Sequence, residues 1–257
     1  MAGEVGRRQG STLFPARQIA TPWWLLIIIL LIGLALLAML RSEAYTNTLL
    51  YLVNGVVVTV RVAVISYLIA LILGLIAGLG RVSRNPLFYT IATVYVEIIR
   101  GIPIFVIILY SQFVIAPVIG TVRNAEISGI IALSIAYGAF LAEVYRAGIE
   151  SIERGQMEAG RSLGMSYVQT MRYIILPQAI RRVLPPLGND FIAMLKDTSL
   201  LSAIAVSELT QLGRIEASRT FDAFRTFNTV AVLYLILTLL LSLGVRVIER
   251  RTSSGRR

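Results

Sequence analysis

Residues 158–177 read EAGRSLGMSYVQTMRYIILP, a polar stretch with two arginines and two glycines that ends at Leu176-Pro177. The chain around it is mostly apolar: 56% of its 257 residues are hydrophobic and only 15% are charged. A soluble domain of this length carries about a quarter charged residues. The composition therefore indicates a membrane protein, and its fold depends on how the quoted stretch is placed between apolar segments.

Several classes of chemistry are excluded by composition. The sequence contains no cysteine and no histidine, which removes disulfides, Cys or His metal sites, thiol nucleophiles and histidine catalysis. It also lacks the G-x-x-x-x-G-K-[ST] phosphate loop. We therefore expect no metal, no cofactor and no enzymatic activity in this chain. An intramembrane enzyme and a passive channel are kept as alternatives of a different class.

Apolar segments long enough to cross a bilayer as helices define the predicted architecture. The first, residues 23–40, begins with a Trp pair typical of a membrane interface and has no cleavage site after it, so it is a retained anchor. The sequence thus predicts an all-α membrane protein with tails at 1–22 and 251–257 and a transmembrane domain at 48–250. The spans predicted within that domain are 52–80, 87–115, 127–146, 187–206 and 228–248.

The distribution of arginines predicts the orientation. With six spans both termini lie on one side, and most arginines fall in the tails, in the turn near 81–84 and in the connection 147–186. Positively charged loops stay on the cytoplasmic side. Both termini and the long connection are therefore expected in the cytoplasm. The net charge of +10 then reflects topology, and no nucleic-acid partner is predicted.

The connection 147–186 is too long to be a simple turn. Apolar and charged residues alternate along it in a pattern that suits short amphipathic helices. Glycines punctuate these helices, and Pro177, Pro185 and Pro186 are expected to separate them from the next span. The residues alone leave two interpretations open, an ordinary interfacial connector or a docking surface for another protein.

A motif in this connection resembles the EAA loop of ABC importer permeases. Glu158-Ala159-Gly160 is followed after three residues by Gly164, and after nine more by a segment ending at Leu176-Pro177. The family motif reads E-A-A, three residues, G, nine residues, I-x-L-P, so Gly160 for the third alanine is the one departure. The segments VEIIRGIPIFV (96–106), YGAFLAEVYRAGIESI (137–152) and PPLGNDFIAMLKDTSL (185–200) are similar to the polar amino acid uptake subfamily.

The resemblance implies a type I ABC importer permease fold in a bacterial inner membrane, with a five-helix core and 23–40 as one extra transmembrane helix. It also implies three partners: two copies of an ABC ATPase subunit that binds the ATP, a second permease chain (a copy or a paralogue), and an extracytoplasmic amino-acid-binding protein. The solute would be a polar amino acid or, alternatively, an opine or amino-acid derivative. The residues implied to couple to the ATPase are Glu158, Ala159, Gly160, Gly164, Leu176 and Pro177.

Charged residues within predicted spans are costly and mark a pathway or a partner. The spacing of Glu97 and Arg100 places them on one helix face, where they can pair, and Lys196 is expected to pair with a carboxylate. Gly101 and Pro103 allow the third span to break, as transporter helices do near binding sites. The candidates for the substrate path are Arg61, Glu97, Arg100, Lys196, Asp197, Thr198 and Ser199.

Arg61 has no acidic residue three or four positions away, so its partner must come from another helix or from a solute. A guanidinium binds a carboxylate through two charge-assisted hydrogen bonds. This hypothesis favours acidic or neutral polar amino acids over arginine and lysine. In the alternative, Arg61 pairs with Glu97 across helices and never meets the solute.

Overall fold

The computed structural model describes residues 23–120 and 124–253, and within them the elements are helices only. The predicted tail 1–22 and residues 254–257 lie outside the described residues. The elements are α1 (Trp23–Leu40), α2 (Glu43–Arg81), α3 (Pro86–Gly101), α4 (Ile104–Tyr110), the π-helical turn η1 (Ser111–Ile115), α5 (Ala116–Ile119), α6 (Ala125–Glu150), α7 (Arg154–Ser162), α8 (Tyr167–Thr170), the π-helical turn η2 (Met171–Ile175), α9 (Leu176–Asp197), the 3-10 helix η3 (Thr198–Ile204), α10 (Leu209–Thr220) and α11 (Ala223–Ser253).

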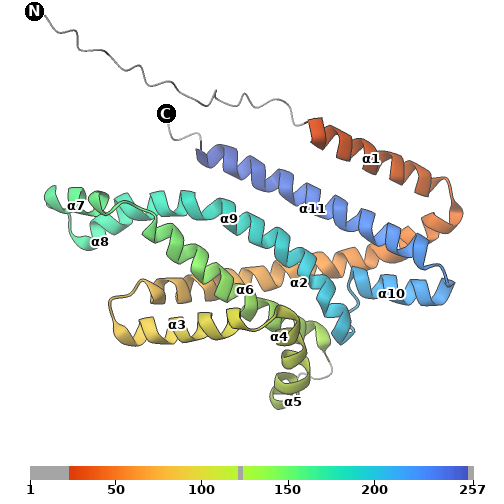
Figure 1. Cartoon of the computed structure of the whole chain (residues 1–257), viewed down its shortest axis with the longest axis horizontal. Helices are drawn as coiled ribbons and strands as arrows, with labels where there is room; N and C mark the ends of the chain where they lie inside the picture. Colours follow the sequence, from red (N-terminus) through yellow and green to blue (C-terminus); the bar gives the residue numbers. More distant parts are fainter. Residues whose placement is uncertain (1–22, 121–123, 254–257) are drawn as a thin grey trace, which may run out of the picture.

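The bundle is built around α2 and α6, which pack closely because glycines on α2 face α6. A Cβ added at Gly74 would lie 2.6 Å from the Leu141 Cβ, and one at Gly78 would lie 2.8 Å from the Tyr145 Cβ. Small residues let membrane helices approach in this way. Helix α9 packs on α6 and α11, and α10 lies against α2 at the end of the bundle opposite α7 and α8 (Figure 1).

The predicted third span, 87–115, is bent, and the break lies where Gly101 and Pro103 allow it. Helix α3 meets the following segment, Ile104–Ile119, at an angle of 101°. Ile102 is extended (φ −104°, ψ 131°), because a proline ring disfavours the helical conformation of the residue before it. The break that Gly101 and Pro103 allow is therefore present in the third span.

Length and composition support fewer spans than the six predicted. In the described part of the chain, three helices could cross a membrane: Glu43–Arg81, Ala125–Glu150 and Ala223–Val247. The bent pair α3 with Ile104–Ile119 raises the number to four if it counts as one span. The apolar segment of α1, Leu25–Leu40, is shorter than these helices. The six-span topology therefore stays a prediction.

Helix α9 begins much earlier than the sequence predicted. Elements α8, η2 and α9 follow one another without interruption from Tyr167 to Asp197, and Pro185 and Pro186 lie inside α9. The expectation that these prolines separate the loop from the next span was wrong. A proline inside a helix removes one hydrogen bond, and in a membrane bundle packing against neighbouring helices compensates for that loss. We call the continuous helical segment formed by α8, η2 and α9 the rod. The predicted fifth span, 187–206, thus covers the C-terminal part of this rod and the 3-10 helix η3 that follows it.

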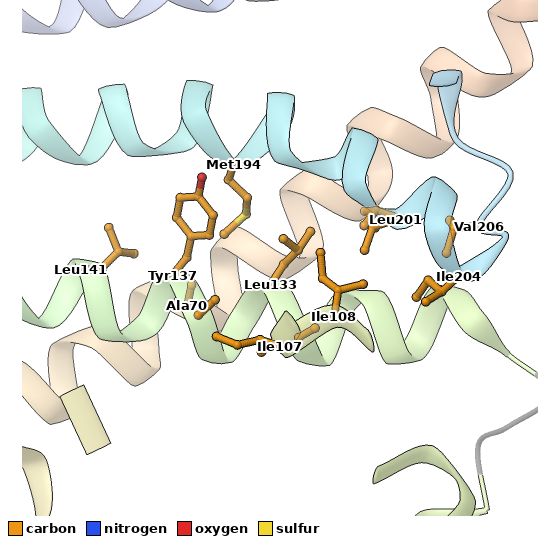
Figure 2. Packing of buried hydrophobic residues seen from close by; sticks show 13 residues of the cluster. Ala70, Ile107, Ile108, Leu133, Tyr137, Leu141, Met194, Leu201, Ile204 and Val206 are labelled. Carbon is orange, nitrogen blue, oxygen red and sulfur yellow. The ribbon is translucent and has the colours of Figure 1, made fainter. Parts of the chain in front are cut away.

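Two irregular points of the backbone meet in the core. The start of α4, just after the α3 break, contributes Ile107 and Ile108, while η3, just after α9 ends, contributes Leu201 and Ile204. These side chains pack with residues of α6 and with Met194 of α9 in one buried cluster (Figure 2). The break in the third span and the end of the α9 rod therefore adjoin in the middle of the bundle.

Candidate functional site

Residues 154–177, called the coupling element below, form an ordered helix–turn–helix. Helix α7 ends where Gly164 adopts the left-handed conformation (φ +81°), and the Met165 N–H donates to the Gly160 carbonyl over 3.2 Å. A glycine after the last helical turn is a common way to satisfy free carbonyl groups. Helix α8 then begins with a capping box between Ser166 and Gln169, which satisfies two backbone N–H groups. Local sequence signals therefore fix this hairpin.

The departure of Gly160 from the EAA motif has a packing explanation. Gly160 is buried, and a Cβ there would lie 2.5 Å from the Cγ2 and 2.9 Å from the Oγ1 of Thr170. Thr170 is itself fully buried, and its hydroxyl donates to the Ser166 carbonyl. The threonine side chain thus occupies the space that an alanine at position 160 would need.

Replacing Gly160 by alanine is expected to destabilise the coupling element. Alanine gains about 1 kcal/mol of helix propensity over glycine, but overpacking a tight contact costs about 1–3 kcal/mol. Thr170→Ala removes the two shortest contacts and leaves the Ile174 Cδ1 at 3.1 Å, so Gly160→Ala should destabilise the element less in that background. Hydrogen–deuterium exchange of residues 154–170 measures both effects. Equal protection of wild type and Gly160→Ala would contradict this explanation.

One face of the coupling element is anchored and the other is exposed. Ile175 of the element packs with Ile152 and Ala179, which flank it in sequence, in a buried cluster. On the other face Glu158 and Ala159 are exposed, and Leu163 keeps 79% of its surface accessible. The motif residues Leu176 and Pro177 are also exposed, whereas Gly160 is buried. The motif is therefore not one continuous surface: it combines exposed contact residues with a buried glycine that sets the helix packing.

Glu158 forms no hydrogen bond or ion pair with any residue in the described ranges. An exposed carboxylate and an exposed leucine on one short helix make a mixed polar and apolar surface of the kind found in protein interfaces. The fold does not need either side chain, which favours the docking interpretation over a plain connector.

The predicted pair of Glu97 and Arg100 does not form. Glu97 instead accepts from Arg81 of α2, with Nη1 3.3 Å from Oε1. The Arg81 side chain also lies 3.1 Å from a Glu143 oxygen of α6, and the Arg100 guanidinium lies 5.8 Å from the centre of the Phe140 ring. These ion pairs therefore link α2, α3 and α6. Sequence spacing did not identify Glu143, the acidic residue that α6 contributes.

Arg61 has a protein partner that the sequence did not reveal. Its Nε and Nη2 donate to the two carboxylate oxygens of Glu126, at the start of α6, over 3.0 and 2.7 Å. The alternative that Arg61 pairs with Glu97 is therefore wrong. Glu126 already provides the bidentate carboxylate contact that Arg61 was expected to make with a solute. The argument that placed Arg61 on the substrate path therefore no longer holds.

The candidates near the end of α9 separate into buried and exposed groups. Asp197 accepts a hydrogen bond from the Tyr137 hydroxyl over 2.8 Å, and the buried Thr198 donates to the Leu195 carbonyl over 2.7 Å. Ser199 is half-buried. The bond between Tyr137 and Asp197 connects the end of α9 to α6, and the bond from Thr198 to Leu195 lies at the start of η3. Asp197 and Thr198 therefore have structural roles.

Lys196 differs from its neighbours. It is exposed, on the side of α9 that turns away from the buried Met194 and Leu195, and the exposed Asn189 lies two turns earlier on the same side. Across residues 23–120 and 124–253 it has no acidic partner, so the expected carboxylate pair is not seen. Lys196 is also the sole lysine in the sequence.

Comparison with known proteins identifies the family. Residues 70–254 match the family model described as "Binding-protein-dependent transport system inner membrane component". The chain belongs to this family of ABC importer permeases. Its predicted membership and all-α permease fold are thereby confirmed.

Individual permeases of this family are similar over most of the chain. The glutamine transport system permease protein GlnP of Escherichia coli (strain K12) is 39% identical over 78% of this chain and 92% of its own length. The L-cystine transport system permease protein TcyB of Bacillus subtilis (strain 168) is 38% identical over 77% and 85%. A solved structure titled as an amino acid ABC transporter with histidines superposes with a TM-score of 0.76, at 35% identity, over 83% of this chain and 98% of that chain.

Proposed function

We propose that this permease carries polar amino acids across a bacterial inner membrane, driven by ATP that binds and is hydrolysed on a separate ATPase subunit present in two copies. The observation that carries the proposal is the coupling element, an ordered hairpin whose exposed Glu158 and Leu163 the fold itself does not use. Family membership supports the same assignment. The chain itself needs no cofactor under this proposal, and both termini lie in the cytoplasm.

The solute passes between this chain and a second permease chain, either a copy or a paralogue. An unpaired ammonium group next to hydrocarbon has a high free energy, so we infer that it faces an aqueous path. Lys196 and Asn189 supply such a polar stripe on the exposed side of α9. An extracytoplasmic binding protein delivers the solute to the end of the bundle that lies opposite the coupling element.

Lys196 contributes the group that binds the solute. Every amino acid has an α-carboxylate, and an ammonium group binds it through charge-assisted hydrogen bonds. Because Arg61 is neutralised by Glu126, it no longer supports a preference against basic amino acids. The relatives named for glutamine and L-cystine support a polar amino acid, and an opine or amino-acid derivative with a carboxylate is the second candidate.

Reconstitution tests the proposal. The chain, combined in proteoliposomes with its ATPase, binding protein and any paralogous permease, should take up labelled glutamine only when ATP is supplied on the ATPase side. The permease alone should neither hydrolyse ATP nor conduct ions. Uptake that needs no ATPase would favour a passive channel, and chemical conversion of a substrate by the permease alone would favour an intramembrane enzyme.

A further inference from the structure

A cleft of about 700 Å³ lies between the end of α2 and the coupling element. Its walls come from parts of the chain that are distant in sequence: the last two turns of α2 with the turn that follows it, the end of α6, and the start of the α8–η2–α9 rod. The residues that line it are Leu75, Leu79, Val82, Ser83, Arg84, Ile149, Tyr167, Met171 and Leu176.

The cleft combines a long apolar wall with one cation. Leu75, Leu79 and Leu176 keep between 42% and 48% of their surfaces exposed. Arg84 lies at the turn after α2, and its guanidinium is 5.7 Å from the centre of the Tyr167 ring. Among the described residues no carboxylate pairs with Arg84. An occupant that matches this lining has an apolar chain and an anionic head.

The position of the cleft also points to a lipid. Helix α2 is long and apolar enough to cross the membrane, and the cleft begins at its last turns and continues onto a polar loop. Such a boundary between apolar and polar surface is where phospholipid headgroups lie. Basic pockets at the cytoplasmic side of transmembrane helices bind anionic headgroups, and the predicted orientation places Arg84 on that side.

We propose that this cleft binds one anionic phospholipid, with an acyl chain along Leu75 and Leu79 and its phosphate at Arg84. The lipid would touch both the end of a membrane helix and Tyr167 and Leu176 of the coupling element. Anionic lipid would thus hold the coupling element against α2. This inference concerns a site separate from the substrate path and does not depend on which solute is carried.

Native mass spectrometry of the purified full chain tests the proposal, with dioleoylphosphatidylglycerol or dioleoylphosphatidylcholine added. The chain should retain phosphatidylglycerol in preference, and Arg84→Gln should weaken that binding about fivefold, since an arginine near an anionic headgroup contributes about this factor. Arg214→Gln is the matched control, because Arg214 is also exposed and without an acidic partner in the described ranges. This control substitution should leave the binding of phosphatidylglycerol unchanged.

A second pair of variants tests the apolar wall. Leu79→Trp should fill part of the cleft and weaken binding of both lipids, whereas Ile72→Trp, at a more exposed position of α2 outside the cleft lining, should not. Equal loss in Arg84→Gln and Arg214→Gln would overturn the site, as would unchanged binding in Arg84→Gln. Displacement of the lipid by inorganic phosphate at millimolar concentration would show a simple anion site and overturn the lipid assignment.

Discussion

Replacing Glu158 by lysine is expected to reduce ATP-driven uptake and stimulation of the ATPase by more than tenfold, while membrane insertion and helical content stay unchanged. Glu158 is exposed and has no partner in the described part of the chain. The substitution therefore breaks no contact that holds the fold. A reversed charge in an interface leaves its partner group unpaired and adds repulsion, which costs several kcal/mol. Uptake and ATP hydrolysis in proteoliposomes measure the effect.

Glu43→Lys provides the control for that experiment. Glu43 is likewise exposed, but it lies in the first turn of α2, at the other end of the bundle. Its reversal should leave coupling intact and cost only a few tenths of a kcal/mol through the helix dipole. If Glu158→Lys retained normal uptake and ATPase stimulation, the coupling role of the exposed face of α7 would have to be abandoned.

Lys196→Gln should raise the KM of amino-acid uptake by about tenfold or more, because it replaces a charge-assisted contact to the solute carboxylate with a neutral one. Basal ATP hydrolysis should not change, since Lys196 is far along the rod from the coupling element. Lys196→Arg should keep part of the affinity, and Arg61→Gln should have a smaller effect on KM because Arg61 already has a carboxylate partner.

The same residue offers a direct reporter of solute binding. Lys196 is the sole lysine in the chain, so an amine-directed reagent modifies one side chain besides the terminal amine. Saturating solute should slow reductive methylation of Lys196 in the assembled transporter, as followed by mass spectrometry. A methylation rate that does not respond to solute, together with an unchanged KM in Lys196→Gln, would remove Lys196 from the path.

Much of the fold could be predicted because hydrophobic length, proline and glycine act locally. The break after Gly101 and the family-type loop both follow from short stretches of sequence. The start of α9 could not be predicted in this way. Pro185 and Pro186 are strong helix breakers in isolation, and only packing against α6 and α11 lets the helix continue through them.

The ion pairs show a different limit. Sequence spacing identifies partners within one helix, such as Glu97 and Arg100, but it cannot rank partners on other helices. Arg61 finds its carboxylate 65 residues away at Glu126, and Arg81 joins Glu97 from α2. Pairing by sequence spacing therefore predicted the Glu97–Arg100 contact, which is replaced by Glu97–Arg81 between two helices. It also missed the Arg61–Glu126 contact.

The unbroken rod from Tyr167 to Asp197 has a mechanical consequence. The helical path from α8 to the end of α9 is continuous and about 45 Å long by the helical rise, with the coupling element at one end and Lys196 at the other, so under the proposed function it would act as a lever. A tilt of about 10° around its midpoint would move each end by roughly 4 Å, given that helical length. Such a displacement is enough to bring an ammonium group into or out of hydrogen-bonding range of a solute. Under the proposed function, a movement of the ATPase subunit would then reach the solute along one continuous helical element.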